Sequence, residues 1–213
     1  MVVSTTGKLR LVFASHNQFK TKEVSQVILG HLIAKGLGEK LEILDLEAIG
    51  CHEAIPETGD TLAGNATLKS SYIYSHYGYD CFADDTGLEV DALNGRPGVH
   101  SARYAGDDQN FERNIQKLLY ELKNEKNRKA RFRTVISLIL RGEEHLFEGV
   151  VNGVMLHEKR GTSGFGYDPI FLPDGHDRTF AEMTLAEKNR ISHRGTALRK
   201  MIAFLEDYLS IEH

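Results

Sequence analysis

Two adjacent acidic residues, Asp84 and Asp85, follow an apolar stretch in the segment "FADDTGLEV". Neighbouring side chains on a β-strand point to opposite faces, so both carboxylates can serve one site only if the strand ends beside them. Thr86 and Gly87 form a break signal, and we therefore expect the strand to end there. Both carboxylates could then converge on a cation. The alternative is a solvated acidic turn.

A third acidic residue, Glu57, lies in "ETGDTLAGNATLK", just before an expected helix that carries Asn65 and Lys69. Magnesium is usually held by one or two carboxylates together with phosphate oxygens and water. Three acids are therefore enough for a Mg²⁺ site if Glu57 joins the aspartates. The alternative is an exposed acidic side chain in a loop.

A possible anion site lies in "SHNQFK", where an expected strand runs into a helix. Free backbone N–H groups and the helix dipole favour anions at such a junction. Lys20, one turn into the helix, adds a positive charge suited to phosphate. The alternative is that Ser15 or Asn17 only caps the helix. The motif is not a Walker A loop, because "TTGKL" lacks its first glycine and the Ser or Thr after Lys8.

The glycine-rich segment "SGFGYDPIF" places Phe165, Gly166, Tyr167 and Asp168 together. Glycine allows a backbone to approach a ligand closely, an aromatic ring can stack on a base, and a carboxylate can accept from ring N–H groups. A tight turn before a strand explains the same residues equally well.

Basic residues gather in "AEKNRISHRGTALRK", namely Lys188, Arg190, His193 and Arg194. A solvated basic surface is the ordinary explanation. However, cations near a helix N-terminus oppose the helix dipole, so a bound anion would account better for them.

Other chemistries lack their residues in this sequence. We find no GxSxG elbow, no HExxH and no deaminase-type His/Cys set. Cys51 and Cys81 do not form a CxxC pair, and a disulfide framework is not expected. Cys51, His52 and Glu53 resemble a metal cluster, but no second cluster would complete a zinc site, so we interpret them as a loop.

The elements that must position these residues are those of an α/β protein. Apolar runs and helical periodicity indicate a β-α-β opening, later helices and a β-hairpin joined by "RGEE". We expect Asp60 or Thr61 to cap the second helix and Thr184 with Glu187 to form a capping box. The expected strands are 9–14, 41–46, 80–83, 130–140 and 145–156, and the expected helices are 18–29, 61–76, 107–123 and 195–209.

The 213 residues, of which 41% are hydrophobic and 26% charged, are typical of a globular protein with a substantial core. The net charge of -4 argues against a basic surface for a nucleic-acid polymer. No segment approaches eighteen apolar residues and no signal-type core is found, so we expect a cytoplasmic protein that does not bind membranes.

Taken together, the segments resemble the inosine/xanthosine triphosphate pyrophosphatase family over about residues 9–209. The motifs that carry the resemblance occur in the family's order: "SHNQFK", "ETGDTLAGNATLK", "FADDTGLEVDALNGRPGVHSARYAG", "GTSGFGYDPIF" and "AEMTLAEKNRISHRGTALRK". The resemblance implies an elongated mixed β-sheet with flanking helices, forming two lobes around a deep cleft. It also implies a homodimer that hydrolyses ITP, dITP or XTP to the monophosphate and pyrophosphate with Mg²⁺, or with Mn²⁺ as a substitute. We expect one two-lobed domain over 8–210 and a disordered leader over 1–7.

The resemblance also implies roles for individual residues. Asp85 would act as the general base, and Glu57, Asp84 and Asp85 would organise Mg²⁺. Lys20 would be catalytic, and Thr86 would touch the substrate. The other expected substrate-binding residues are Ser15, His16, Asn17, Gln18, Phe19 and Lys20 at the triphosphate, and Phe165, Gly166, Tyr167, Asp168, Lys188, His193 and Arg194 around the base or its phosphates.

The sequence departs from the family pattern at His16, where many members have glycine, and at Thr86, where many have serine. Two rival functions stay open. One is a related pyrophosphatase for pyrimidine or methylated nucleotides, and the other is a nucleotide sensor that has lost catalysis. The presence of Glu57, Asp84, Asp85 and Lys20 argues against the sensor.

Overall fold

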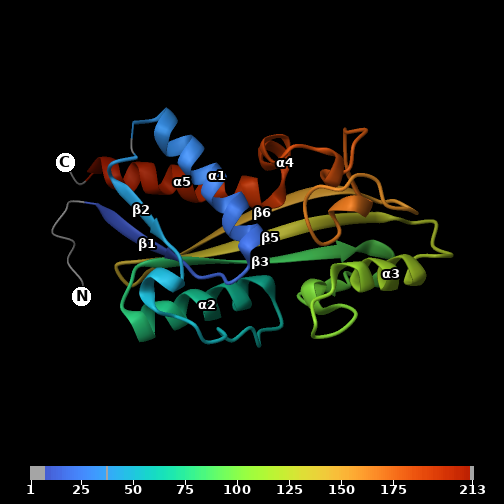
Figure 1. Cartoon of the computed structure of the whole chain (residues 1–213), viewed down its shortest axis with the longest axis horizontal. Helices are drawn as coiled ribbons and strands as arrows, with labels where there is room; N and C mark the ends of the chain where they lie inside the picture. The colour runs from blue at the N-terminus through green and yellow to red at the C-terminus, as the bar shows by residue number, and fades with distance from the viewer. Residues whose placement is uncertain (1–7, 37, 212–213) are drawn as a thin grey trace. The chain divides into compact units, whose positions relative to one another are not determined.

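The computed structural model describes residues 8–36 and 38–211, so the expected leader at 1–7 lies outside the described residues (Figure 1). The chain divides into two compact units. The first contains the described residues up to Asp85, then Val135–Glu148, and the C-terminal residues from Ala197. The second contains Thr86–Thr134 and Gly149–Thr196. This mixed α/β architecture with two units agrees with the fold class expected from the sequence.

Within the described residues the strands form one seven-stranded sheet in the order β2-β1-β3-β5-β6-β7, with β4 paired to β3. The strands are β1 (Leu9–Phe13), β2 (Leu41–Leu44), β3 (Cys81–Val90), β4 (Pro97–Gly98), β5 (Lys129–Leu140), β6 (Glu143–Met155) and β7 (Phe171–Pro173). The helices are α1 (Gln18–Ala34), α2 (Leu62–Tyr77), α3 (Phe111–Glu121), α4 (Leu185–Ile191) and α5 (His193–Ile211). Short 3-10 turns are η1 (Glu47–Ile49), η2 (Asp91–Leu93), η3 (Ser101–Arg103), η4 (Asp168–Ile170) and η5 (Phe180–Glu182).

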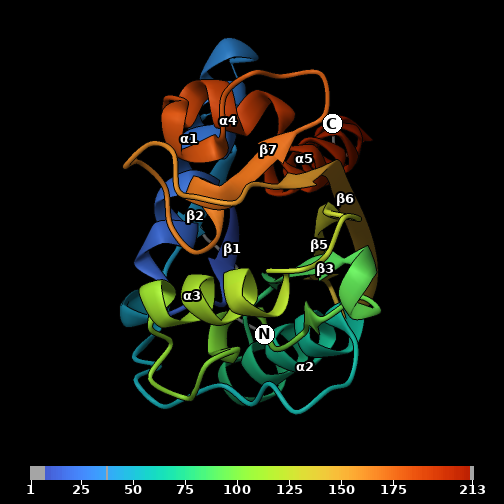
Figure 2. The ribbon, with the colours of Figure 1, turned by 90° about the vertical axis from the view of Figure 1, so that its right-hand side faces the viewer.

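The first unit buries both faces of the strand β1. β1 pairs in parallel with β2 and with the start of β3. Leu11 and Phe13 face a core shared with α1 and α5, whereas Val12 and Ala14 face a second core shared with α2. Figures 1 and 2 show α1 and α2 on opposite sides of β1. Burial on both faces explains why this strand is a continuous apolar run rather than an alternating one.

The helix α1 is longer than its sequence suggested. We expected it to end at about Leu29, terminated by Gly30, Gly36 and Gly38, but the helix continues through Gly30 to Ala34, and Gly36 follows its end at φ +68°. Gly30 does not interrupt the helix because glycine can adopt helical angles, although at an entropic cost. Of the two residues expected to cap α2, Asp60 and Thr61, the structure has Thr61, whose side chain accepts from the Gly64 N–H at 2.9 Å.

The strand β3 contradicts a prediction that was central to the site. We expected it to end at Thr86 and Gly87, but it runs for 10 residues to Val90. Its far end is paired with β4, so the Thr-Gly pair is held in a sheet instead of a turn. Asp84 and Asp85 therefore lie in mid-strand, with side chains on opposite faces.

The second unit has a core of its own. Side chains from β3, β5, α3, β7 and η5 meet there, and Phe132 of β5 packs edge-on against Phe171 with ring centroids 4.7 Å apart. The core residues include Leu88, Val90, Ile115, Leu118, Leu122, Phe132, Ile170, Phe171 and Phe180. This core supports the loop that carries Phe165.

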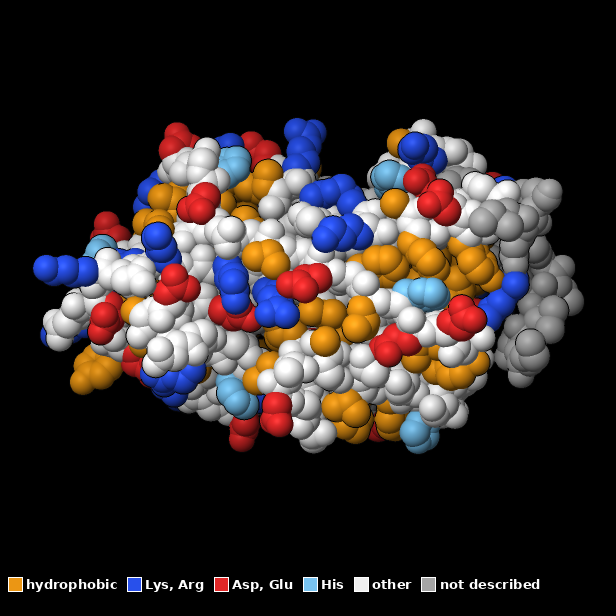
Figure 3. Space-filling model, turned by 180° about the vertical axis from the view of Figure 1, so that it is seen from behind, with side chains coloured by type: hydrophobic (Ala, Val, Ile, Leu, Met, Phe, Trp, Pro, Cys, Tyr) orange, Lys and Arg blue, Asp and Glu red, His pale blue; other side chains and the backbone are white. Residues whose placement is uncertain are grey.

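The expected hairpin and the expected capping box are both confirmed. β5 and β6 are neighbours joined by Arg141 and Gly142, both at positive φ, as a two-residue hairpin turn requires. Thr184 and Glu187 form the expected capping box of α4. Both cysteines are free and buried. Among the described residues, none of the helices has the length and apolar character needed to cross a membrane. Acidic and basic side chains are interspersed on the face shown in Figure 3.

Candidate active site

The two adjacent aspartates each meet a lysine from a different helix of the first unit. Lys20 of α1 lies 3.2 Å from the Asp84 carboxylate, and Lys69 of α2 lies 3.6 Å from the Asp85 carboxylate. Both ammonium groups also donate to the main-chain carbonyl of Asp84, at 3.4 Å from Lys20 and 2.7 Å from Lys69. Strand alternation thus separates the two carboxylates, while one backbone carbonyl is shared by the two lysines.

Asp85 has the surroundings expected of a tuned carboxylate. It is 8% exposed, and one oxygen accepts from the Asn65 side-chain amide at 3.1 Å. Burial raises the pKa of Asp85 above its usual range, and the nearby ammonium groups of Lys69 and Lys20 oppose this shift. A carboxylate with a raised pKa is a better proton acceptor near neutral pH than an ordinary aspartate.

Glu57 and Asp85 both contact Lys69. Its carboxylate lies 2.6 Å from the Lys69 ammonium group. Burial by itself would lower the pKa of Lys69, but the charges of Asp85 and Glu57 reverse the effect and leave it raised. The lysine therefore remains a cation between two carboxylates. Together with Asn65, Asp84 and Lys20, these residues are called the carboxylate cluster below.

The three acids do not converge as the sequence analysis expected. Within the described residues, no group of three His, Cys, Asp or Glu side chains is close enough to hold a metal ion. Glu57 and Asp85 do present hard oxygen donors around one positive charge, which is the donor chemistry that Mg²⁺ prefers. Two carboxylates completed by phosphate oxygens and water therefore fit Mg²⁺, whereas a site made of three protein carboxylates does not.

The N-terminal loop of α1 forms the helix cap that was weighed as the alternative to an anion site. Asn17 caps the helix, because its side-chain oxygen accepts from the Phe19 and Lys20 N–H groups at 3.0 and 3.2 Å. Ser15 accepts from the Asn17 N–H at 3.2 Å. The cap thus holds Lys20 on the turn where it reaches Asp84. Gln18 and Phe19 are exposed at the start of the helix.

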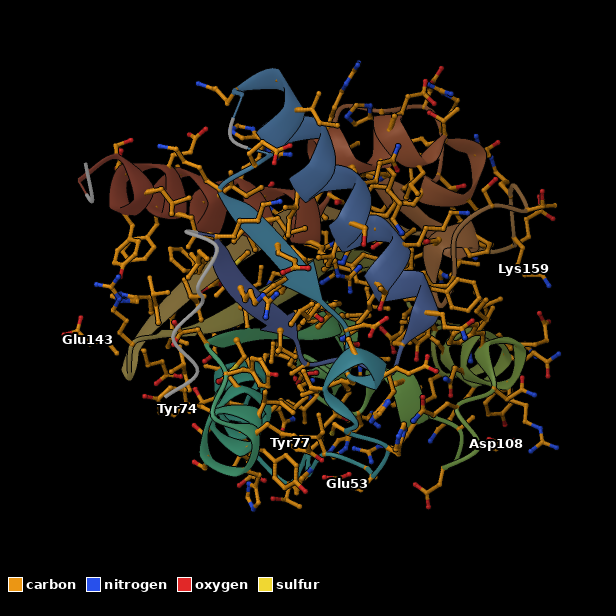
Figure 4. The ribbon with its side chains drawn as sticks, turned by 60° about the vertical axis from the view of Figure 1, so that its left-hand side comes forward. Glu53, Tyr74, Tyr77, Asp108, Glu143 and Lys159 are labelled. Carbon is orange, nitrogen blue, oxygen red and sulfur yellow. The ribbon has the colours of Figure 1, made fainter. Side chains whose placement is uncertain are left out.

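His16 contacts a neighbouring loop. Its Nε2 lies 3.0 Å from the main-chain oxygen of Glu53, and must donate there because a carbonyl only accepts. The Glu53 carboxylate accepts in turn from the hydroxyls of Tyr72 and Tyr77, at 2.9 and 2.6 Å, and these hydrogen bonds lower the pKa of Glu53 to about 2. Figure 4 shows Glu53 beside Tyr77 of α2. These contacts tie the loop that carries Glu57 to α2.

In the second unit, Phe165 lies among charged side chains that are almost fully buried. Lys188 forms an ion pair with Asp168 at 2.6 Å and lies 4.9 Å from the centre of the Phe165 ring. Asp168 also accepts from the Phe165 N–H at 2.9 Å. The guanidinium of Arg194 lies 5.7 Å from the same ring. We call Phe165, Asp168, Lys188 and Arg194 the aromatic-cation cluster.

Arg194 and His193 are not the solvated basic residues that the ordinary explanation assumes. They are 1% and 3% exposed. Arg194 donates to the Thr86 hydroxyl at 3.1 Å, and His193 stacks on Phe132 with ring centroids 4.7 Å apart. The burial of a cation without compensation is costly, so these residues need anionic or polar partners.

Two members of the glycine-rich loop are placed differently from the expectation of a base pocket. The Tyr167 side chain lies in the core of the second unit, and its hydroxyl donates to the Ser101 carbonyl at 2.9 Å. The Asp168 carboxylate, which was expected to accept from a base, accepts through its Oδ2 from Lys188 and from the Phe165 backbone. Gly166 is half-buried at φ +60°, so the tight turn weighed as an alternative is present.

Asn65, Lys69 and Thr134 were absent from the expected site. For the first two, the sequence carried a usable signal. The buried face of α2 contains Leu62, Asn65, Ala66, Lys69, Ser70 and Ile73, at helical spacing. A lysine and an asparagine on an otherwise small or apolar stripe must find buried partners. Thr134 had no such signal, because threonine is common on strands.

Comparison with known proteins supports the resemblance. The model of the Ham1 family matches residues 11–204, and the chain belongs to this family. It is 54% identical over 197 residues to a dITP/XTP pyrophosphatase of Christiangramia forsetii, covering 92% of this chain and 99% of that protein. It is 43% identical over 198 residues to a dITP/XTP pyrophosphatase of Bacillus subtilis, covering 92% and 96%.

Solved structures agree with the fold. A Ham1 protein of Staphylococcus aureus superposes with a TM-score of 0.81 at 38% identity, covering 93% of this chain and 99% of that one. A HAM1 protein of Coxiella burnetii gives a TM-score of 0.83 at 36% identity, with the same coverage.

Proposed function

We propose that this chain is a pyrophosphatase that hydrolyses non-standard purine nucleoside triphosphates, namely dITP, ITP and XTP, to the monophosphate and pyrophosphate. The observation that carries the proposal is the buried Asp85 carboxylate, held by Asn65 and flanked by Lys69 and Lys20. Relatives at 54% and 43% identity are named dITP/XTP pyrophosphatases, which supports the same substrate class.

In the proposed reaction, Asp85 takes a proton from water as the water oxygen attacks phosphorus. The α–β phosphoanhydride bond breaks, and the leaving group carries away the electron pair of that bond. The leaving group is pyrophosphate if water attacks the α-phosphorus and the monophosphate if water attacks the β-phosphorus. Lys20 and Lys69 oppose the negative charge that builds up during the attack, since fixed cations in a buried site act strongly on such charge. Asn65 keeps the Asp85 carboxylate oriented through its 3.1 Å hydrogen bond.

The proposal includes Mg²⁺, which Glu57 and Asp85 would hold together with substrate oxygens and water. Asp84, the third carboxylate expected from the sequence, is paired with Lys20 instead. When bound, the ion neutralises phosphate charge and polarises the phosphorus centre. Mn²⁺ is expected to substitute because it accepts the same oxygen ligands.

The aromatic-cation cluster is proposed to recognise the base. Phe165 provides a face on which a purine can stack, and Lys188, His193 and Arg194 are donors toward a 6-oxo group. Adenine would place an amino donor against these donors and leave buried groups unpaired, which disfavours it strongly. Guanine shares the 6-oxo group and must be rejected at its 2-amino group.

The homodimer and the cytoplasmic location implied by the family resemblance belong to this proposal as well. Light scattering coupled to size-exclusion chromatography measures the first directly. A mass equal to one chain across the micromolar range would contradict a dimer.

The test of the function is pyrophosphate release from dITP with Mg²⁺, beside dGTP, dATP, dTTP and UTP. We expect rapid release from dITP and slow release from the others. Preference for dTTP or UTP would favour a pyrimidine-directed enzyme. Tight binding of dITP by folded protein without turnover would instead identify a sensor.

A further inference from the structure

A buried hydroxyl of the second unit lies directly behind an expected substrate contact. The Thr134 side chain on β5 is 0% exposed, and its Oγ1 lies 2.7 Å from the Oγ1 of Thr86 on β3. Thr86 is partly exposed and accepts a hydrogen bond from Arg194 at 3.1 Å. Arg194, Thr86 and Thr134 therefore form a continuous chain from a buried cation to a buried hydroxyl.

The direction of the hydroxyl hydrogens decides what Thr86 can offer a substrate. A hydroxyl has one hydrogen to donate and two lone pairs to accept with, whereas a guanidinium only donates. Arg194 therefore occupies one lone pair of the Thr86 oxygen. If Thr134 donates to the other lone pair, the Thr86 hydrogen is not used in the hydrogen bond between the two threonines. If Thr86 donates to Thr134, that hydrogen is spent inside the protein.

An anionic substrate selects between these two directions. Oxygens of phosphate and of a 6-oxo purine are acceptors, so they bind a Thr86 that donates and repel one that presents only lone pairs. Hydrogen bonds to charged groups are stronger than neutral ones, which favours the donating arrangement once an anion is present. Thr134 is the residue that makes this arrangement possible, because it supplies the compensating donor.

We propose that Thr134 is a positioning residue that orients the Thr86 hydroxyl as a donor toward substrate and holds the Thr86 oxygen at Arg194. This inference rests on the proposed function. It gives the Thr134 hydroxyl a role in substrate binding in addition to its structural hydrogen bond on the strand.

The test is a double-mutant cycle of Thr134→Val and Thr86→Val, read as kcat/KM for dITP. Valine keeps the branched shape and removes the hydroxyl. We expect Thr134→Val to lower kcat/KM about tenfold in the wild-type background, which corresponds to one lost hydrogen bond. In the Thr86→Val background the same change should cost less than about twofold, because the hydroxyl it acts through is gone.

Two further variants separate positioning from stability. Thr134→Ser restores a hydroxyl and should return kcat/KM to within about twofold of wild type. Thr179→Val is the matched control, because Thr179 is equally buried in the same unit and donates to the Arg160 carbonyl at 2.8 Å. Thr179→Val should change kcat/KM for dITP by the same factor in the wild-type background and in the Thr86→Val background.

The outcomes of these experiments test the role of Thr134 and the proposed function separately. Equal losses from Thr134→Val in both backgrounds, or wild-type kinetics for Thr134→Val, would overturn the inference. Should Thr134→Val fail to fold, Thr134→Ala enters the same cycle. Absence of dITP turnover in the folded wild-type protein would contradict the proposed function itself, and binding of dITP by the four cycle members would then test the same coupling.

Discussion

At the scale of single residues, Lys69 shows how burial and charge are balanced. Desolvation of an ammonium group is costly, and an unpaired lysine in the same place would lose its proton. Here the carboxylates of Asp85 and Glu57 and the carbonyl of Asp84 compensate, so the pKa is raised instead of lowered. The same arrangement leaves Asp85 with a raised pKa, because its own burial outweighs the attraction of the lysines.

Replacement of Asp85 by asparagine tests its proposed role as base. Asparagine keeps the shape but cannot accept a proton from water, so we expect kcat for dITP to fall by at least about a thousandfold, within the range that general-base removal produces. Circular dichroism should show an unchanged fold. Asp207→Asn, an exposed change on α5, is the control that should retain full activity. Near wild-type rates in Asp85→Asn would disprove the assignment.

At the scale of elements, a turn gives the aromatic-cation cluster its geometry. Gly164 has φ +76°, and a Cβ there would lie 2.1 Å from the Asp168 carboxylate oxygen. This oxygen holds both the Phe165 N–H and Lys188. The space beside Gly164 is therefore what allows Asp168 to connect the loop with α4.

Gly164→Ala should displace Asp168 and weaken dITP binding. We expect KM to rise about tenfold with a smaller effect on kcat, because the lost contact stabilises the bound substrate and the transition state equally. Gly166→Ala is the matched control. Gly166 also has positive φ, at +60°, but a Cβ there meets nothing within 4 Å. Both variants carry the backbone strain of an L-residue at positive φ, and only Gly164→Ala adds the clash. Equal KM values for the two would contradict the role given to Asp168.

The helix α1 offers a second element-level prediction. Gly30 is exposed within the helix and a Cβ there meets nothing within 4 Å. Gly30→Ala should raise the free energy of unfolding by about 0.5–1 kcal/mol, because alanine loses less backbone entropy in a helix. Gly36→Ala, at φ +68° beyond the helix end, should lower it instead. Urea denaturation measures both, and destabilisation by Gly30→Ala would show that the helix is interrupted there.

At the scale of the whole molecule, each unit has its own core, yet neither core is made from one continuous stretch of chain. The strands β3, β5 and β6 and the helix α5 contribute residues to both units. Unfolding of one unit would thus require partial loss of elements that belong to the other. We expect one cooperative unfolding transition for the whole chain.

The substitution Leu118→Ala tests whether the whole chain unfolds in one transition. Leu118 is 0% exposed in the core of the second unit, and such truncations cost about 2–5 kcal/mol. The denaturation midpoint should fall while a single transition is kept, with coincident curves from circular dichroism and tyrosine fluorescence. Tyr120→Ala, on the same helix but 78% exposed, should change stability by less than about 0.5 kcal/mol. Two separate transitions would show that the units unfold independently.

The sequence by itself determined the order and type of the main elements, because apolar runs and helical periodicity depend only on residues that are close together in the sequence. It also determined the capping box at Thr184 and the α/β class, and it narrowed the cap of α2 to Asp60 or Thr61. The family resemblance added the segments in which the site lies. Glu57, Asp85, Lys20, Lys188 and the basic residues at the start of α5 were named as candidates in this way.

Tertiary structure decided how those residues are paired. Whether β3 stops at Thr86 depends on its pairing with β4, which is contributed by a segment further along the chain. The separation of Asp84 from Asp85 onto two faces follows from that continuation. The partnership of Lys69 with Glu57 and Asp85, and of Thr134 with Thr86, depends on side chains far apart in sequence meeting in a buried environment. The local sequence does not show which distant residues will meet. Burial determines how strongly each contact contributes to stability, and it exists only after the chain has folded.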